Sequence, residues 1–355
     1  MDTQSIWKSS ATLADGREII YFDEAPGSGR AQVPDTRPLG PRTPGPALPT
    51  GRHEWGTRWD PLAGEWVVIA AARQDRTFLP PADQCPLDPS RPGHPTEIPA
   101  SSYDVAVFEN RFPSLAEPLG RCEVVCFTAD HDSSFAALTP RRVRTVLEAW
   151  VDRTEALSAL PGIRQVYCFE NRGEEIGVTL HHPHGQIYAF PFVAPKLARM
   201  VAQARVYEGG GNLFDDLVAR EMAAGERVVI SNEHWVAFVP EAARWPYEVR
   251  IFPLERVPDL PALGADAREA FGPLYLDVLR RFDALFGVPA PYIAAWHQTP
   301  LDDPADRDRF AAHLQVLSVR RAAGKLKYLA GTESGMGVWI NDIVPEEAAQ
   351  RLREA

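Results

Sequence analysis

This chain of 355 residues has little cysteine, no long apolar run and no excess of basic charge. No segment approaches the run of about 18 apolar residues that a membrane helix needs. Thirty-seven basic residues against 48 acidic ones leave a net charge of −11, which argues against a nucleic-acid partner held by bulk charge. The cysteines are too few and too irregularly spaced for a disulfide framework: Cys85, Cys122, Cys126 and Cys168.

The rest of the composition is typical of a soluble globular protein. Apolar residues make up 45% and charged residues 24%. The length is sufficient for one large or two ordinary domains with sizeable cores. The segment Met1–Ser5 lacks the basic-then-apolar pattern of a secretory signal. We therefore expect a cytoplasmic enzyme without a membrane partner.

The N-terminal region, residues 1–51, is expected to be peripheral. Residues 16–22 are predicted to form a short strand, and residues 31–50 contain six prolines without sustained apolar periodicity, as in an extended arm. The main body is expected to begin near Arg52. Its first apolar run, residues 66–70, is predicted to be a buried strand.

A strand–strand–helix–strand pattern occurs twice, at an offset of 125 residues. Thr139 before Pro140 predicts the start of a helix that runs to Leu157. The pattern predicts an α+β fold of two duplicated halves, residues 52–205 and 206–355, with a mainly antiparallel sheet flanked by helices. The alternative is a chance similarity of apolar strands. The first copy has strands at 104–108, 123–127 and 165–169; the second has strands at 247–252 and 292–297 and a helix at 267–285.

The densest chemical signal is the segment 181–186, His-His-Pro-His-Gly-Gln. Alternate side chains of an extended strand share a face, so His182, His184 and Gln186 are expected to point the same way. Polar groups in a row are costly to bury without partners. Gly185 is expected to let a ligand approach the backbone. We interpret the segment as part of a binding or catalytic site.

The His-Pro-His-Gly-Gln segment resembles the signature of galactose-1-phosphate uridylyltransferases, the transferase branch of the histidine-triad superfamily. The resemblance runs from about Arg52 to the C-terminus, and the tail at 335–342 is most similar to actinobacterial members. Further blocks that resemble the family, in the family's order, lie at 169–173, 233–235, 295–297 and 327–333.

The resemblance implies a double displacement. His184 would attack the α-phosphorus of UDP-glucose and expel glucose 1-phosphate, and galactose 1-phosphate would then take the uridylyl group. Hydrolases of the superfamily carry histidine where this chain has Gln186, and this difference favours transfer over hydrolysis.

The implied substrate-binding residues are Arg73, Arg76, Asn110, Asn171, Gly177, Thr179, Lys327, Tyr328, Thr332 and Glu333. In the family the last four contact the hexose across a dimer interface, so a homodimer is implied, whereas Arg111 stands where other members have an aspartate.

The resemblance also implies metal sites. Relatives often hold zinc with two cysteines and two histidines, and the matching residues here are Cys85, Asp88, His131 and His182. Carboxylate oxygen is an accepted zinc ligand, although oxygen in place of thiolate should weaken the affinity. A second site of some relatives, typically for iron, uses a glutamate and three histidines. Because its counterparts are Met200, His297, His313 and Gln315, we expect iron to be absent.

Two other functions stay open. A related enzyme could transfer an adenylyl group as a sugar-phosphate phosphorylase, and preference for ADP-glucose over UDP-glucose would distinguish it. A catalytically idle paralogue that binds nucleotide sugars is the other alternative. Intact His184 and Gln186 argue against the idle protein, whereas Asp88 and Arg111 argue mildly for divergence.

Overall fold

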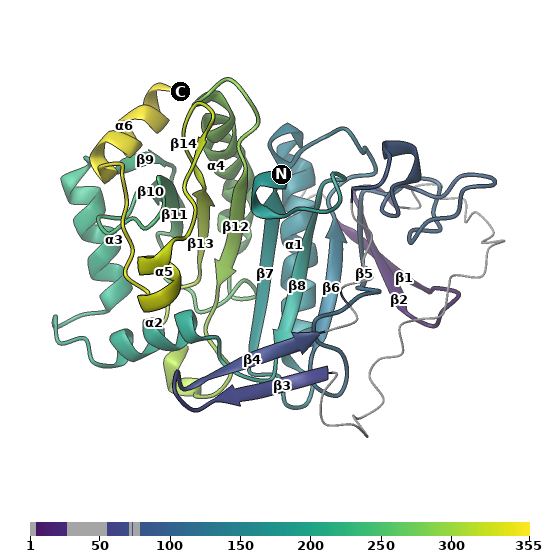
Figure 1. The fold of residues 1–355 in the computed structure, drawn as a ribbon, viewed down its shortest axis with the longest axis horizontal. Coiled ribbons are helices and arrows are strands. Elements are labelled where there is room, and N and C mark those ends of the chain that lie inside the picture. The colour runs from purple at the N-terminus through teal and green to yellow at the C-terminus, as the bar shows by residue number, and fades with distance from the viewer. Residues whose placement is uncertain (1–4, 27–54, 71–72, 74–78) are drawn as a thin grey trace.

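An antiparallel sheet forms the centre of the molecule (Figure 1). The computed structural model describes residues 5–26, 55–70, 73 and 79–355. Eleven strands form one sheet in the order β1-β2-β5-β6-β8-β7-β12-β13-β11-β10-β9, and all neighbouring pairs are antiparallel. The strands are β1 (Trp7–Thr12), β2 (Glu18–Asp23), β5 (Val105–Glu109), β6 (Arg121–Cys126), β7 (Gln165–Arg172), β8 (His184–Phe190), β9 (Val228–Ser231), β10 (Trp235–Phe238), β11 (Tyr247–Pro253), β12 (Tyr292–His297) and β13 (His313–Ser318).

Two hairpins and the helices complete the described part of the chain. The hairpins pair β3 (Trp55–Asp60) with β4 (Glu65–Ala70) and β14 (Arg320–Ala322) with β15 (Lys325–Leu326). None of the described helices has both the length and the apolar character needed to cross a membrane. They are α1 (Pro140–Ser158), α2 (Pro195–Arg205), α3 (Leu213–Ala224), α4 (Ala265–Ala284), α5 (Gly331–Met336) and α6 (Pro345–Glu354), with short 3₁₀ helices η2 (Ala82–Gln84), η3 (Phe135–Ala137), η4 (Glu174–Ile176) and η5 (Pro304–Asp306).

The strand order shows two related halves. In the first half the order is β5-β6-β8-β7, and in the second half, counted from the other side, it is β10-β11-β13-β12. β7 and β12 pair where the halves meet, so a pseudo-twofold axis passes between them. α1 and α4 lie behind the same face of the sheet in Figure 1 and contribute to one shared core. The predicted α+β fold of duplicated halves is confirmed.

The predicted repeat offset of 125 residues is wrong by one. Cys126 packs on the sheet face away from α1, whereas Ile251, its predicted counterpart, belongs to the core shared with the helices. Strand side chains alternate between faces, so an odd shift exchanges the two faces. Phe169 and Ala295, which are 126 positions apart, lie directly opposite each other where β7 meets β12. An offset of 126 therefore relates these central strands.

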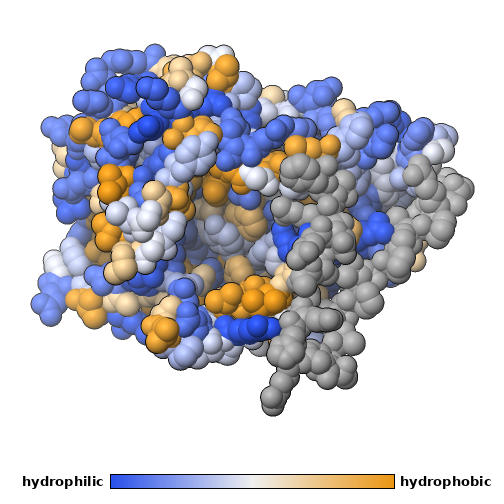
Figure 2. Space-filling model, viewed as in Figure 1, coloured by the Kyte–Doolittle hydropathy of each residue, from blue (hydrophilic) through white to orange (hydrophobic). Residues whose placement is uncertain are grey.

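The face of the sheet opposite α1 and α4 is covered unevenly, and the gap in its cover determines where the site lies. Over the second half, α2 and α3 cover the strands, with Leu197 and Phe214 packed in one cluster with Phe252. Over the first half, residues 79–104 cover β2, β5 and part of β6. β7 and β8 keep an accessible region beside that cover, and Figure 2 shows this side of the molecule hollowed near its centre.

Two expectations about the early part of the chain need correction. The strand predicted at 16–22 is β2, but it is not peripheral, because it pairs with β5 and its residues Ile19 to Phe22 are buried. The strand predicted at 66–70 is β4, but Trp66 and Val67 are 42% and 44% exposed, since β4 pairs only with β3. The predicted division after residues 51 and 205 stays a prediction.

The start of α1 follows the prediction. Pro140 opens the helix, and the side chain of Thr139 accepts a hydrogen bond from the backbone N–H of Arg142. A proline loses nothing at the first helical position, where its missing N–H would have had no partner inside the helix.

A carboxyl group lies buried near the middle of the sheet. Oε1 of Glu170 on β7 accepts a hydrogen bond of 2.9 Å from the Tyr292 hydroxyl, and Oε2 has no hydrogen-bond partner among the described residues. Burial raises the pKa of Glu170 to about 8, although the Tyr292 hydrogen bond opposes this rise. The folded protein therefore holds this carboxyl protonated at neutral pH.

Glu170 should make stability fall as the pH rises. Between about pH 4.5 and 8 the folded state binds a proton that the unfolded state has lost, so this contribution is fully present only below that range. Relative to Glu170→Gln, the free energy of unfolding of the wild type should fall by about 2 kcal/mol between pH 5 and 7. Urea denaturation of both proteins across this range measures the effect. Parallel pH curves would contradict a protonated Glu170.

Candidate active site and metal site

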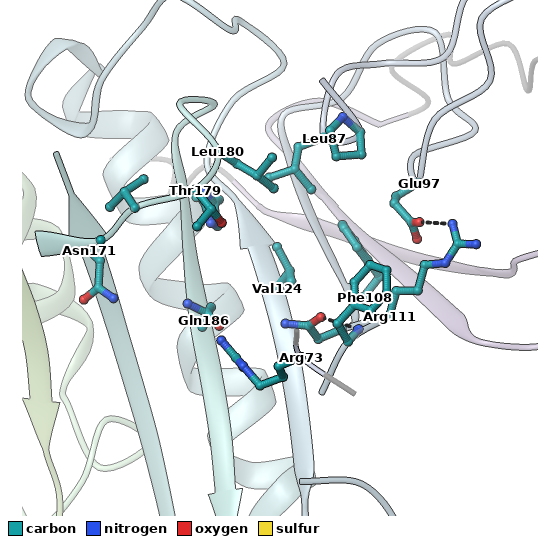
Figure 3. A pocket seen from close by; sticks show the side chains of 16 residues that line it. Arg73, Leu87, Glu97, Phe108, Arg111, Val124, Asn171, Thr179, Leu180 and Gln186 are labelled. Carbon is teal, nitrogen blue, oxygen red and sulfur yellow. Dashed lines mark hydrogen bonds and ion pairs between the residues drawn. The ribbon is translucent and has the colours of Figure 1, made fainter. Parts of the chain in front are cut away.

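A cavity of about 370 Å³ lies over the first half of the sheet. Its walls come from β5, β6, β7 and β8, on the sheet face opposite α1, and from the chain segments around residues 87, 97 and 179 (Figure 3). The lining residues include most of those implied by the resemblance, together with apolar walls: Arg73, Asn110, Asn171, Gly177, Thr179, His184 and Gln186, with Leu87, Phe108, Val124 and Leu180.

His184 begins β8 and lies in this cavity as a neutral imidazole. Its Nδ1 is 2.7 Å from the carbonyl oxygen of His182, which can only accept, so Nδ1 carries the proton. Burial lowers the pKa of His184 to about 4. Nε2 therefore keeps its lone pair at neutral pH, as a nucleophilic nitrogen requires.

Gln186 is held by a short chain of hydrogen bonds. Arg73 Nη1 donates to the Tyr188 hydroxyl (3.0 Å), which donates to Gln186 Oε1 (3.1 Å). Arg73 Nη1 also donates to Ser114 Oγ at 2.6 Å. The amide oxygen of Gln186 is thereby engaged, and its NH₂ group is the part that can donate to a ligand. Arg73 and Gln186 lie near each other at one end of the cavity in Figure 3.

An ion-pair network lines another part of the cavity. Arg111 Nη1 lies 3.1 Å from Glu97 Oε1, and the buried guanidinium of Arg17 also contacts Glu97 and donates to the backbone carbonyl of Glu109 at 2.7 Å. Asn110 Oδ1 accepts from the Phe112 N–H at 2.8 Å. Arg111, which occupies the position of the family's aspartate, is thus paired with a carboxylate from another segment.

Some implied residues lie elsewhere. Arg76 lies outside the described residues. The four residues implied to contact the hexose do not line this cavity. Lys327 and Tyr328 follow β15, and Thr332 and Glu333 lie in the first turn of α5. There Lys327 Nζ bonds Glu333 Oε1 at 2.8 Å, Thr332 donates to Glu333, and Tyr328 is 73% exposed.

The role expected for Gly185 is wrong. Gly185 is buried on the face of β8 that points away from the cavity, and a Cβ there would lie 2.7 Å from Phe127 Cζ and 2.8 Å from the Phe169 carbonyl oxygen. The glycine is therefore required for packing beneath the site rather than for ligand approach.

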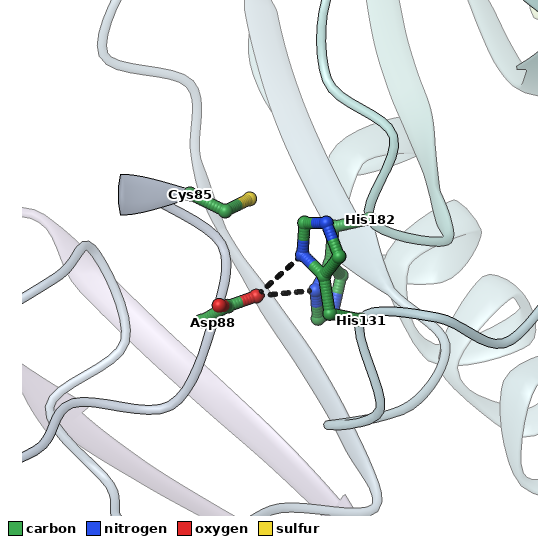
Figure 4. A group of neighbouring side chains, drawn as sticks. All are labelled: Cys85, Asp88, His131 and His182. Atoms are coloured by element: carbon green, nitrogen blue, oxygen red, sulfur yellow. Dashed lines mark hydrogen bonds and ion pairs between the residues drawn. The ribbon is translucent and has the colours of Figure 1, made fainter. Parts of the chain in front are cut away.

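The four implied zinc ligands come together beside the cavity (Figure 4). One potential ligand atom from each of Cys85, Asp88, His131 and His182 lies within 4.8 Å of the others. Asp88 Oδ1 is 2.8 Å from His131 Nδ1 and 2.9 Å from His182 Nδ1. The four residues are recruited from the loop after η2, the loop after β6 and the segment before β8.

The hydrogen bonds of His182 show that this set fits a cation. Its Nε2 lies 2.8 Å from the carbonyl oxygen of Thr128, which can only accept, so Nε2 carries a proton. Burial lowers the pKa of His182, which disfavours a second proton on Nδ1. A lone pair of Nδ1 then faces the Asp88 carboxylate at 2.9 Å, an arrangement that a metal ion between them would stabilise. Burial also raises the pKa of the Cys85 thiol to about 11, so this ligand must lose its proton on binding.

Several residues of the site were missed from the sequence. Tyr188 continues the alternation of His184 and Gln186 and could have been found by extending that pattern along β8. Ser114, Glu97 and the apolar walls come from distant segments, and no local pattern marks them.

Known proteins match the chain along most of its length. Two family models match: "Galactose-1-phosphate uridyl transferase, N-terminal domain" over residues 116–194 and "Galactose-1-phosphate uridyl transferase, C-terminal domain" over residues 199–355. A galactose-1-phosphate uridylyltransferase of Streptomyces lividans is 50% identical, over 98% of this chain and 97% of that protein. A protein of the same name from Thermotoga maritima is 35% identical, over 84% and 97%.

A solved structure extends the likeness to three dimensions. A structure described as that of a uridylyltransferase superposes with a TM-score of 0.74 at 28% identity, and the match covers 84% of this chain and 97% of that one. The identity, the coverage and the two family models agree. The chain belongs to the galactose-1-phosphate uridylyltransferase family.

Proposed function

We propose that the protein transfers a uridylyl group from UDP-glucose to galactose 1-phosphate, giving UDP-galactose and glucose 1-phosphate. The observation that carries this proposal is the neutral His184, whose Nδ1–H is fixed by the His182 carbonyl and whose Nε2 is left with a lone pair beside Gln186. Family membership supports the reaction and its substrates. We expect the enzyme to act in the cytoplasm, in keeping with its four free cysteines.

The proposed reaction has two balanced steps. In the first, the lone pair of His184 Nε2 forms a bond to the α-phosphorus of UDP-glucose, and the bond from that phosphorus to the bridging oxygen breaks, releasing glucose 1-phosphate. In the second, a phosphate oxygen of galactose 1-phosphate attacks the same phosphorus, and the P–N bond breaks to return the electron pair to Nε2. Phosphate oxygens attack and leave, so no strong general acid is needed.

The surrounding residues are assigned by their chemistry. The hydrogen bond from Nδ1 to the His182 carbonyl orients the ring and stabilises the positive charge that it gains during attack. Gln186 and Arg73 donate to phosphate oxygens, with Arg76 assigned by resemblance alone. The apolar walls, together with Asn110 and Asn171, contact the uridine. Gly177 and Thr179 are proposed to contact the phosphates.

The hexose loop is proposed to act in a homodimer. Lys327, Tyr328, Thr332 and Glu333 lie outside the cavity of their own chain, and the family resemblance supports their reaching the cavity of a second copy. Tyr328 is largely exposed, as such a contact would need.

We propose zinc as the ion of the Cys85, Asp88, His131 and His182 set. Bound there, zinc would supply a rigid cross-link between the loops that cover the cavity and the residue whose carbonyl orients His184. The ion is assigned no step of the transfer.

The covalent role of His184 is tested by intact mass. Brief incubation with UDP-glucose alone should add one uridylyl group to the wild type and release glucose 1-phosphate. His184→Asn should acquire no adduct and keep its fold by circular dichroism, because the amide lacks a nucleophilic lone pair on nitrogen. ADP-glucose serves as the control donor. An adduct with ADP-glucose alone would replace uridylyl by adenylyl transfer, and an adduct on His184→Asn would exclude His184 as nucleophile.

Gln186 is tested by two substitutions. Gln186→Ala removes the donor to the phosphate and should slow transfer by about a hundredfold. Gln186→His keeps a donor but adds a group that can exchange protons, so it should slow transfer less and release some free uridine monophosphate. Chromatography of the nucleotide products measures both rates. If Gln186→Ala transfers as fast as the wild type, the amide does not hold the phosphate.

The altered ligand at position 88 is tested by metal analysis. The wild type should contain up to one zinc per chain. Asp88→Cys should hold zinc against higher chelator concentrations, since thiolate suits zinc better than carboxylate does, and Asp88→Ala should hold it less well. Elemental analysis after dialysis against graded chelator gives the order. Equal retention by all three proteins would show that position 88 is not a ligand.

A further inference from the structure

A second buried polar cluster lies in the other half of the sheet. Lys196, in the first turn of α2, directs its Nζ to Gln315 Oε1 and to His297 Nε2, at 3.3 Å from the latter. Gln315 Nε2 donates to Glu248 Oε1 at 2.6 Å. Glu248 has no exposed surface, and His297 and Gln315 are 6% and 5% exposed. The reaction proposed above uses none of these groups.

The pseudo-twofold axis relates Gln315 of this cluster to Gln186 of the first half. Val124 lies opposite Gln186 between β6 and β8, and Arg250, 126 positions further on, lies opposite Gln315 between β11 and β13. Gln315 is therefore the counterpart of Gln186, and the residues two positions earlier, His184 and His313, also correspond.

The local geometry of the two histidines supports the correspondence. His184 Nδ1 lies 2.7 Å from the carbonyl of His182, and His313 Nδ1 lies 2.9 Å from the carbonyl of Ala311, in each case two residues earlier. The surroundings differ, because the His313 ring stacks on Phe252 at 4.5 Å and also contacts Phe214 and Phe310. A pocket like that of the first half is filled here.

We infer that the Lys196 ammonium is the resident cation of this second site, held by the lone pairs of His297 and Gln315 in place of a bound metal ion. An ammonium group can only donate, so Gln315 Oε1 accepts from it. His297 Nε2 lies 3.3 Å from Lys196 Nζ and 3.2 Å from Gln315 Oε1, and in this assignment the lone pair of Nε2 faces the ammonium. A divalent ion bound to His297 would also lie within a few ångströms of this positive charge. Met200, one turn along α2, adds no carboxylate. The residues therefore do not fit the second metal implied by the resemblance.

The charges around Lys196 are of both signs. Glu248 is the anion that faces it through Gln315, and Arg250 lies 3.6 Å from the same carboxylate oxygen. Burial lowers the pKa of Lys196 to about 8; Glu248 opposes the fall, and Arg250, Arg244 and Arg199 add to it. The ammonium form therefore predominates at neutral pH. α2 begins shortly after β8 ends. The contacts of Lys196 therefore attach the segment that follows β8 to the second half of the sheet.

Removal of the charge should cost stability. Lys196→Met keeps an unbranched stem without the ammonium and should lower the melting temperature by about 3 °C, because buried acceptors lose their donor. Lys8→Met, which removes a half-exposed lysine paired with Asp152, should change it by less than about 1 °C. Calorimetry of the three proteins gives the comparison. An unchanged melting temperature for Lys196→Met would overturn the inference.

Cation counts give a second, independent test. The wild type should bind no more than the one metal held at the Cys85 site, even with excess Co²⁺. The double variant Lys196→Ala/Met200→Glu removes the ammonium and adds a carboxylate, so it should bind one further Co²⁺ and be stabilised by it against heat. A second Co²⁺ in the wild type, or no additional ion in the double variant, would refute a cation position here. Neither readout depends on the transfer activity.

Discussion

The alternation of β8 between two faces is the constraint on which the site depends. Gly185, Ile187 and Ala189 are buried on the face of β8 that points away from the cavity. Gly185 fits there only because it has no Cβ. The residues between them then necessarily face the cavity. A slip of one residue would bury Gln186 and expose the apolar residues, so the core and the cavity require the same register.

His182 links the proposed metal site to His184. Its ring lies among the four potential metal ligands, while its carbonyl oxygen fixes the proton of His184 on Nδ1. Displacing the ring would move the backbone that holds the nucleophile. Asp88 Oδ1, 2.9 Å from His182 Nδ1, holds the ring in the absence of a bound ion as well.

Much of the fold and part of the site follow from local sequence patterns. The period of two residues placed His184 and Gln186 on one face, and Thr139–Pro140 marked the start of α1. The burial of each strand was harder to predict. β2 is buried in the large sheet, where it pairs with β5 from far along the chain. β4 is equally apolar, but among the described residues it pairs with its neighbour β3 alone. The family resemblance identified the four potential metal ligands, and the fold brings them together. Glu97 and Ser114 reach the cavity through tertiary packing, for which no nearby residue gives a signal.

The one-residue error in the repeat has a physical origin. Short apolar strands match at many offsets by residue type alone, but an offset of 125 in place of 126 exchanges the two faces of β6 and β7. When the strands are aligned with their faces matched, His184 corresponds to His313 and Gln186 to Gln315. The surroundings of the two pairs differ. In the first half the cavity beside them stays accessible; in the second half α2, α3 and three phenylalanines occupy the space. The same strand geometry therefore supports a cavity in one half and a packed apolar cluster in the other.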